Sequence, residues 1–396
     1  MTKTTQDTNL LPAEVRKALD QMYPALIELR RSIHREPELA WQEFKTTEKI
    51  EQFLAQHRPD KIYRPLKTGL VAEIINNKSS RFLGLRADID ALAIPDRKKV
   101  SYASKQSGIS HSCGHDVHTT VMAGIAAILQ KFKTRIPLNV RIIFQPAEEP
   151  IPSGAPKMID QGVLTDLETI WAMHVEPGLP LGTVSLTSGW VNAQSIRLNW
   201  NIVGKGGHSA RPDQAIDPIR ASSKLIQEIN QYFDKMPRTE SIFAFTAVES
   251  KSAYNAIPDQ AEIGGTLRIT DITRKDQYLQ AVERFNRQIE QQFQVGIHFT
   301  AVSGAPPVVN DENVVKKFIS ILKSIAPDQY QIVTNFRSMG GDDFGWYLQQ
   351  VPGVLIRFGI ATNDKAPALH TGLFDVPEEI IREAIEFFLY QIFNWQ

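Results

Sequence analysis

The chain has 396 residues, with 44 Lys and Arg against 44 Asp and Glu, so its formal net charge at pH 7 is zero. This length exceeds what one hydrophobic core usually supports, and two domains are the default expectation. The balanced charge removes the electrostatic reason to expect nucleic acid or a membrane surface as a partner, and it favours a small-molecule ligand.

Two features of the sequence concern the cellular compartment. The beginning, MTKTTQDTN, has neither the apolar run nor the small-residue cleavage site of a secretory signal. Nowhere do about 18 uncharged apolar residues follow one another, as a membrane-spanning helix requires. We therefore expect a cytoplasmic protein.

The sole cysteine, Cys113, cannot form an internal disulfide, so it is either a buried apolar residue or a functional thiol.

Helices and strands are expected to alternate through the first half of the chain. Apolar residues return at helical spacing over residues 12–33, which predicts an amphipathic helix, and a second helix is predicted over 46–54. Predicted strands then cover 69–75, 82–85, 140–144 and 170–173, with a helix over 118–132. This alternation is typical of an α/β sheet, whose ligand crevice lies beyond the carboxyl ends of its strands.

The pattern changes between about Val191 and Val302 to strand, helix, strand, strand, helix, strand. The predicted elements are 195–203, 215–233, 241–248, 261–269, 274–293 and 297–302. This is the ferredoxin-like order, and such a unit closes its own small sheet. We therefore predict a two-domain α/β protein, with a catalytic domain formed by residues 1–190 and 304–396 and an inserted ferredoxin-like α+β domain over 191–303. A helix over 377–395 ends the chain.

One short segment concentrates metal-binding side chains. Between His111 and His118 the sequence places one thiol and three imidazoles within eight positions, at the start of an apolar helix. A structural zinc site normally needs four closed ligands, often from pairs of cysteines, and the chain has no second cysteine. A nucleophilic cysteine paired with a histidine is an alternative, although such a mechanism does not require the acids described next.

A pair of adjacent acids, Glu148 and Glu149, follows a strongly apolar predicted strand. Because adjacent side chains point in different directions, one glutamate can bind a metal while the other accepts a proton from the bound water. The alternative is a solvated turn. His174 also follows a short apolar strand, and His370 lies in the segment PALHTG. Each histidine alone is more commonly a core or loop residue, and only the whole pattern indicates a metal site.

With these segments assembled, the chain resembles the M20 metallopeptidase family, and specifically its amidohydrolase branch, which includes hippurate hydrolases, auxin-conjugate hydrolases and N-acetyl-diaminopimelate deacetylases. The motifs that carry the resemblance extend over most of the chain. They cover residues 29–39, 85–92, 112–118, 145–149, 204–208, 255–259 and 369–371.

The resemblance implies a binuclear metal centre, whereas the residues alone indicated one metal cluster. It implies two divalent ions, with zinc or manganese expected and cobalt or nickel as alternatives, and Glu148 as the general base. The implied ligands are Cys113, His115, Glu149, His174 and His370. Asp88, Asp90 and His118 are similar to outer groups that orient such ligands, although Asp88 and Asp90 also suit loop caps.

The resemblance also assigns roles within the inserted domain, which it identifies as a lid and dimerisation element. His208, after Lys205-Gly-Gly, would polarise the scissile carbonyl, in some relatives from the partner subunit of a homodimer. Asn255 and Arg268 would bind the carboxylate end of the substrate; a surface strand arginine is the alternative for Arg268. His34, on the opening helix, is interpreted as structural.

The expected reaction is hydrolysis of the amide bond of an N-acyl amino acid, hippurate-like or N-acetylated, to a carboxylate and a free amino acid. A metallo-dipeptidase or carboxypeptidase on the same scaffold is the enzymatic alternative, and a non-catalytic metal-binding or ligand-sensing protein is the alternative of another class. The acyl and amino-acid preferences stay open, because several positions depart from the family pattern. These are Val117, Pro150, Asp213, Asp342 and Gly372.

Overall fold

The structure is a computed structural model of the chain, and it describes residues 11–76, 79–325, 329–362 and 366–395. The chain divides into two compact units. The first comprises Met1–Val191, Val309–Phe336 and Asp343–Gln396, and the second comprises Asn192–Val308 and Arg337–Asp342. No sequence pattern had indicated that the short segment 337–342 belongs to the second unit. The domain boundaries predicted at residues 190 and 303 stay a prediction.

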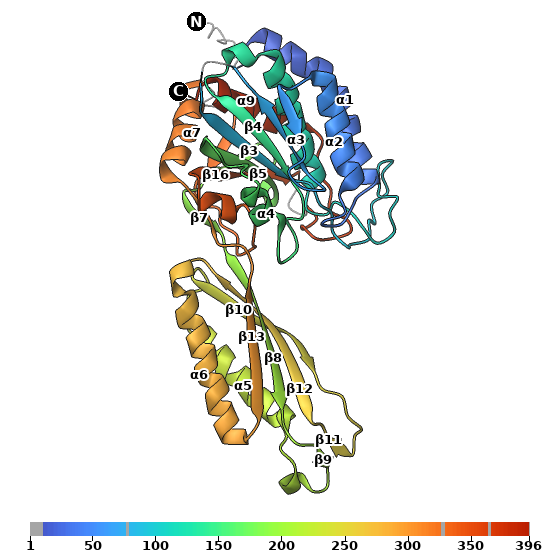
Figure 1. Cartoon of the computed structure of the whole chain (residues 1–396), viewed down its shortest axis with the longest axis vertical. Coiled ribbons are helices and arrows are strands. Elements are labelled where there is room, and N and C mark those ends of the chain that lie inside the picture. Colours follow the sequence, from blue (N-terminus) through green and yellow to red (C-terminus); the bar gives the residue numbers. More distant parts are fainter. Residues whose placement is uncertain (1–10, 77–78, 326–328, 363–365, 396) are drawn as a thin grey trace, which may run out of the picture. The chain divides into compact units, whose positions relative to one another are not determined.

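The first unit is built on a mixed eight-stranded sheet (Figure 1). In spatial order its strands are β1 (Lys61–Tyr63), β2 (Leu70–Ile74), β4 (Asn139–Gln145), β3 (Phe82–Asp88), β5 (Leu167–Pro180), β16 (Gly353–Ala361), β6 (Thr183–Ser185) and β15 (Gln331–Val333). The four central strands, β4, β3, β5 and β16, run parallel to their neighbours among these four. Their carboxyl ends therefore meet at one edge of the sheet, where α/β proteins bind ligands.

The helix α3 (His115–Lys131) is the buried centre of the helical layer. Every residue from His115 to Leu129 is buried, as expected for a helix that is apolar on all sides after its first two turns. Three other helices pack against it: α1 (Ala13–Arg35), α2 (Phe44–His57) and α9 (Glu379–Phe393). The remaining helices of this unit are η1 (Lys133–Arg135), α4 (Gly154–Asp160), α7 (Glu312–Ile325) and α8 (Gly345–Leu348), and β7 (Gly189–Asn192) pairs with β14 (Val308–Asn310).

The second unit has its own antiparallel sheet and its own core. Its elements follow one another as β8 (Gln194–Val203), α5 (Pro218–Phe233), β10 (Ser241–Glu249), β12 (Gln260–Ile269), α6 (Lys275–Phe293) and β13 (Gly296–Ser303), and the spatial strand order is β10-β12-β8-β13. Alternate residues of β8, including Leu198 and Trp200, pack with residues of α5 and α6. Two short strands, β9 (Gly207–His208) and β11 (Ala256–Ile257), pair separately, and η2 (Pro212–Gln214) and η3 (Ile272–Arg274) complete the unit.

Three predicted boundaries differ from the structure for identifiable reasons. The buried helix begins at His115 rather than at residue 118, because Gly114 adopts a left-handed conformation and turns the chain into the helix. β5 continues to Pro180 despite its prolines, with a register shift between Gly359 and Ala361 of the neighbouring strand. His174 therefore lies within a strand, not after one. α5 begins at Pro218, where the Asp217 carboxylate accepts hydrogen bonds from two amides of the first turn.

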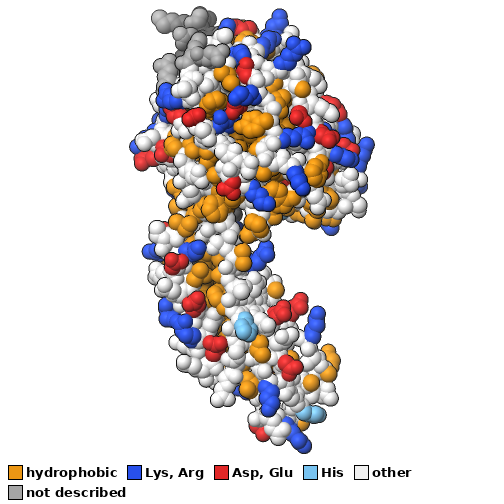
Figure 2. All heavy atoms as spheres, viewed as in Figure 1, with side chains coloured by type: hydrophobic (Ala, Val, Ile, Leu, Met, Phe, Trp, Pro, Cys, Tyr) orange, Lys and Arg blue, Asp and Glu red, His pale blue; other side chains and the backbone are white. Residues whose placement is uncertain are grey.

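The surface carries charges of both signs. On the face drawn in Figure 2, basic and acidic side chains are interspersed over each unit rather than sorted by sign. Among the described residues, each helix is either too short or too polar to span a bilayer.

Candidate metal centre

The predicted metal-site residues of the first unit converge at one edge of its sheet. Cys113 lies two residues before the start of α3, the two adjacent glutamates follow β4, and His174 lies on β5. His370 follows β16, and its backbone N–H donates to the Ser112 carbonyl at 2.8 Å. That hydrogen bond ties the segment carrying His370 to the segment carrying Cys113.

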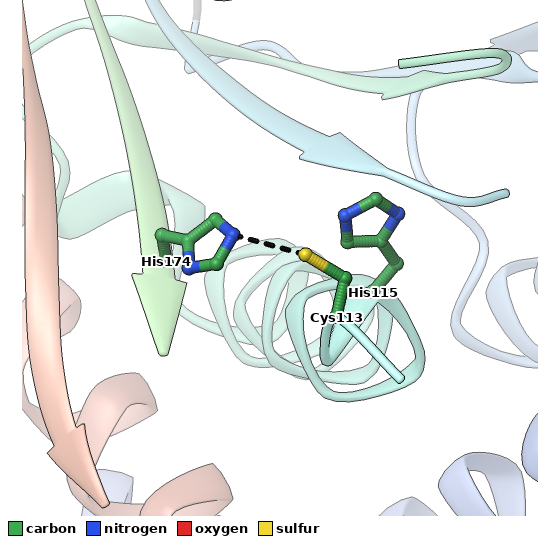
Figure 3. A group of neighbouring side chains, drawn as sticks. All are labelled: Cys113, His115 and His174. Atoms are coloured by element: carbon green, nitrogen blue, oxygen red, sulfur yellow. Dashed lines mark hydrogen bonds between the residues drawn. The ribbon is translucent and has the colours of Figure 1, made fainter. Parts of the chain in front are cut away.

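Gly114 explains how Cys113 comes close to β5. Its φ angle is +90°, and a Cβ atom at this position would lie 2.4 Å from Cγ2 of Val175. Only glycine allows this approach of the α3 start to the strand. As a result, Sγ of Cys113 lies 3.4 Å from Nε2 of His174. Figure 3 shows the sulfur directed between the rings of His174 and His115, and all three side chains are buried.

Hydrogen bonds to Nδ1 fix which nitrogen of two histidines can bind a metal. Nδ1 of His115 lies 2.9 Å from the carbonyl oxygen of Asp90, and Nδ1 of His174 lies 2.6 Å from that of Val175. A carbonyl oxygen only accepts, so both Nδ1 atoms carry a proton and Nε2 is the atom left for a cation. Nε2 of His115 is buried and has no hydrogen-bond partner among the described residues.

Two glutamates and a third imidazole, that of His370, extend the cluster. Among the groups whose ligand atoms lie within 4.8 Å of one another, three consist wholly of predicted site residues: Cys113 with His115 and His174, Cys113 with Glu149 and His370, and His115 with Glu148 and Glu149. Any two of these groups have one residue in common, which is Cys113, His115 or Glu149. Such overlap fits two neighbouring ions better than one. Thiolate, imidazole and carboxylate are a donor set that suits zinc and its neighbours in the first transition row. His370 is half exposed, so the site opens to solvent there.

His118 lies in the same cluster but has no free nitrogen. Its Nδ1 lies 2.7 Å from Oδ1 of Asp88, and its Nε2 accepts the N–H of Val175 at 3.1 Å. Burial alone would raise the pKa of Asp88, but His115, Arg86 and His118 hold it well below its usual range. Asp88 is therefore an anion that orients His118.

Asp90 links two candidate ligands from different elements. Its Oδ1 lies 3.2 Å from Nδ1 of His115, and its Oδ2 accepts the N–H of Glu149 at 3.1 Å. One buried carboxylate thus fixes both the imidazole at the start of α3 and the backbone after β4. Carboxylates that hydrogen-bond to metal ligands commonly fix the orientation of those ligands.

The electrostatics of the site favour cation binding coupled to proton release. Burial and the nearby charge of Glu149 raise the pKa of the Cys113 thiol. Burial alone would lower the pKa of His115, yet Asp88 and Cys113 raise it. Burial, His118 and Arg357 lower the pKa of His174. Because metals bind thiolate and neutral imidazole, a cation bound by Cys113 and His115 must displace protons.

The three other predicted site residues lie in the second unit. His208 on β9 pairs with Ala256 of β11, and the Ser209 N–H donates to the Asn255 carbonyl at 3.0 Å. His208 and Asn255 are therefore neighbours. Arg268 pairs with Ser195 near the first residue of β8. His208 follows the last residue of β8 in the sequence, so it belongs to the opposite end of that strand. Nη1 of Arg268 donates to the Met339 carbonyl at 2.9 Å. Within this unit the structure brings His208 and Asn255 together and leaves Arg268 apart.

The sequence did not reveal a buried network beside the site. Arg86 donates to Oδ2 of Asp88 at 2.5 Å and to Oδ1 of Asp343 at 2.6 Å. The Asp343 N–H in turn donates to Oε1 of Glu148 at 3.3 Å. Arg86 belongs to the motif LRADIDAL, but its partner Asp343 lies 257 positions away, so only the fold makes the contact visible.

Comparison with known proteins places this arrangement in a family. A model of Peptidase family M20/M25/M40 matches residues 84–393. The chain belongs to this family. The M20 resemblance and the α/β fold predicted from the sequence are therefore confirmed.

Individual relatives match three quarters or more of the chain. An N-acetylcysteine deacetylase of Bacillus subtilis is 34% identical over 370 residues, which cover 92% of this chain and 94% of the relative. An N-acyl-L-amino acid amidohydrolase of Geobacillus stearothermophilus is 32% identical over 301 residues, covering 75% and 81%. The solved YxeP protein of Bacillus subtilis, described as a dinuclear metal binding M20 peptidase, superimposes with a TM-score of 0.82 at 32% identity, covering 94% and 98%.

Proposed function

We propose that the protein is a metal-dependent amidohydrolase that cleaves N-acyl amino acids to a carboxylate and a free amino acid. One observation carries the proposal: in a chain of the M20 family, thiol, imidazole and carboxylate ligand atoms form overlapping groups within 4.8 Å, and one of these groups includes Glu148. The similarity to a deacetylase of an N-acetyl amino acid and to an N-acyl-L-amino acid amidohydrolase supports this substrate class.

The proposed metal ligands are those expected from the sequence. Cys113, His115, Glu149, His174 and His370 would hold two divalent cations, with zinc or manganese first and cobalt or nickel as alternatives. The orientation of Nε2 on His115 and His174 and the clustering of ligand atoms within 4.8 Å support this assignment. Bound divalent metal supplies a Lewis acid that polarises the amide carbonyl and lowers the pKa of a coordinated water toward about 7.

Glu148 is the proposed proton carrier. Its Oε1 accepts the Asp343 N–H at 3.3 Å, and its carboxylate lies within 4.8 Å of ligand atoms of His115 and Glu149. From this position it would take the proton of the attacking water and later deliver it to the departing amine. The adjacent Glu149 cannot combine this task with metal binding, which is why the site uses two glutamates.

We also propose that the active enzyme is a homodimer. Along β8, eight residue steps lead from Ser195, the partner of Arg268, to Val203 at the strand end before His208. At 3.3 Å per residue this distance is about 26 Å, more than a small N-acyl amino acid spans. If His208, Asn255 and Arg268 all bind one substrate, they come from two subunits.

Mixing two inactive variants tests the dimer. His208→Ala and Glu148→Gln proteins, each inactive alone, should regain activity after unfolding and refolding together, because a mixed dimer contains one site with both groups intact. Light scattering should show a dimer. A monomer, or mixed protein without activity, would contradict the proposal.

Assay of metal-reconstituted protein against N-acyl amino acids and dipeptides tests the activity itself. Turnover of acetylated or benzoylated amino acids, abolished by chelation and restored by metal, is expected. Preference for dipeptides would identify a peptidase instead, and metal binding without turnover would identify a non-catalytic protein.

The cytoplasm is the proposed compartment, since the sole cysteine is assigned to metal binding and not to a disulfide.

A further inference from the structure

The backbone immediately before the two glutamates has an unusual conformation. Ala147 has a φ angle of +54°, in the left-handed region that residues with a Cβ atom seldom adopt. Such a conformation persists only where surrounding contacts impose it, and it occurs often at functional sites. Because Glu148 and Glu149 are the next two residues, the turn at Ala147 sets the directions in which both side chains leave the backbone.

Two hydrogen bonds hold Ala147, and one comes from a distant side chain. Its N–H donates to Oε1 of Glu43 at 2.8 Å, across 104 positions of sequence. Its carbonyl accepts the N–H of Gly154 at 2.7 Å. Glu43 and Ala147 are both wholly buried, so solvent cannot replace the hydrogen bond that the Ala147 N–H donates to the carboxylate.

The Glu43 side chain does not serve the helix that it precedes. Glu43 is the N-terminal cap residue of α2, yet its side chain accepts no hydrogen bond from that helix. Glu38 takes this role, since its carboxylate accepts the N–H groups of Lys45 at 3.2 Å and Thr46 at 2.8 Å. The Glu43 carboxylate instead accepts from Ala147 and from the Trp41 N–H at 3.0 Å. A helix cap therefore does not explain this acid.

We infer that Glu43 is a positioning residue for the metal centre, whose carboxyl group holds Ala147 in its left-handed conformation and thereby aims Glu148 and Glu149. The inference rests on the proposed function, in which these two glutamates are the general base and a metal ligand. Burial, together with the charge of Asp90, raises the pKa of Glu43 to about 7. Its carboxyl group is therefore only partly ionised near neutral pH, and glutamine, which keeps an acceptor oxygen at the same place, is its closest substitute.

Three variants of the metal-loaded protein test the inference, with kcat, KM, metal affinity by chelator competition, and Tm as readouts. Glu43→Ala should lower kcat about 100-fold and metal affinity about 10-fold, as expected for displaced supporting groups. Glu43→Gln should keep both within a few-fold of the wild type, because its amide oxygen accepts the same two N–H groups. The control, Glu38→Ala, should lower Tm and leave kcat and metal affinity unchanged.

The inference is overturned if Glu43→Ala keeps the kcat and metal affinity of the wild type, or if Glu43→Gln loses as much as Glu43→Ala. If Glu43→Ala does not fold, Glu43→Asp, whose carboxylate is one methylene too short to reach Ala147, should lose at least about 10-fold in kcat; unchanged kcat would overturn the inference. An inactive wild type would refute the proposed function alone, since metal affinity still decides the role of Glu43.

Discussion

Nδ1 of His118 lies 2.7 Å from Oδ1 of Asp88, while its Nε2 accepts the N–H of Val175. Both nitrogens of this buried imidazole are therefore occupied by the protein. Nε2 of His115, one helical turn earlier, has no hydrogen-bond partner among the described residues and lies 3.8 Å from Oδ2 of Asp88. Two histidines of the same motif thus have different tasks: His115 is available to a cation, and His118 supports the strand that carries His174.

This difference predicts unequal effects of two matched substitutions. His115→Asn should reduce metal affinity by more than the roughly 10- to 100-fold expected for loss of an outer group, whereas His118→Asn should stay within that range. Competition with a chromophoric chelator measures both. A larger loss for His118→Asn than for His115→Asn would show that the ligand assignment is reversed.

Replacement of Cys113 by serine should weaken zinc binding more than manganese binding. A thiolate is a soft ligand that favours zinc, and a hydroxyl group is hard, so the ratio of the two affinities should fall. The same chelator titration with each metal provides the measurement. Cys113→Ser protein that keeps wild-type zinc content after exposure to chelator would remove the thiol from the ligand set.

Glu148→Gln and Glu149→Gln should separate proton transfer from metal binding. Glu148→Gln keeps an oxygen that can accept the Asp343 N–H, so it should bind two metal ions while kcat falls at least about 100-fold. Glu149→Gln should lose metal as well as activity. Metal analysis beside steady-state kinetics distinguishes the two, and full turnover in metal-loaded Glu148→Gln would exclude that residue as the base.

The buried cluster around His34 should make stability depend on pH. Nδ1 of His34 lies 2.7 Å from Asp116 and Nε2 lies 3.2 Å from Asp96. Burial alone would lower the pKa of His34, but Asp116 and Asp96 raise it above 6.5. A raised folded-state pKa means that the stabilisation is complete below the unfolded value and is lost as pH rises through the folded value.

His34→Gln measures this contribution. The difference in free energy of unfolding between wild type and His34→Gln should be largest between about pH 5 and 6.5 and should shrink toward pH 9. Below that window it should also fall, because the pKa values of Asp96 and Asp116 are depressed and both become protonated in acid. Urea titrations of chelator-treated protein provide the values. A difference that grows with pH would contradict a charged His34.

Periodicity and local motifs were enough to predict most helices and strands and one metal cluster, whereas the set of five candidate ligands was implied by the resemblance to the M20 family. They succeed because the central strands are apolar runs and because catalytic residues follow the ends of parallel strands. The start of α3 and the length of β5 were missed, since a left-handed Gly114 and a register shift beside Pro180 depend on tertiary packing.

Contacts between distant segments could not be predicted. Glu43 reaches Ala147 across 104 positions and Arg86 reaches Asp343 across 257, and neither pair belongs to a common local pattern. The separation of Arg268 from His208 is also a property of strand pairing. Each residue type was visible in the sequence, but the partner that gives it a role was not.

Anomalous diffraction at the zinc absorption edge, from crystals of zinc-loaded protein, tests the metal centre most directly. Two peaks are expected within the cluster of Cys113, His115, Glu149, His174 and His370, with Zn–S near 2.3 Å and Zn–N near 2.0–2.1 Å. Bound zinc found only elsewhere, with the Cys113 sulfur in no contact with metal, would contradict the proposed centre and the chemistry derived from it.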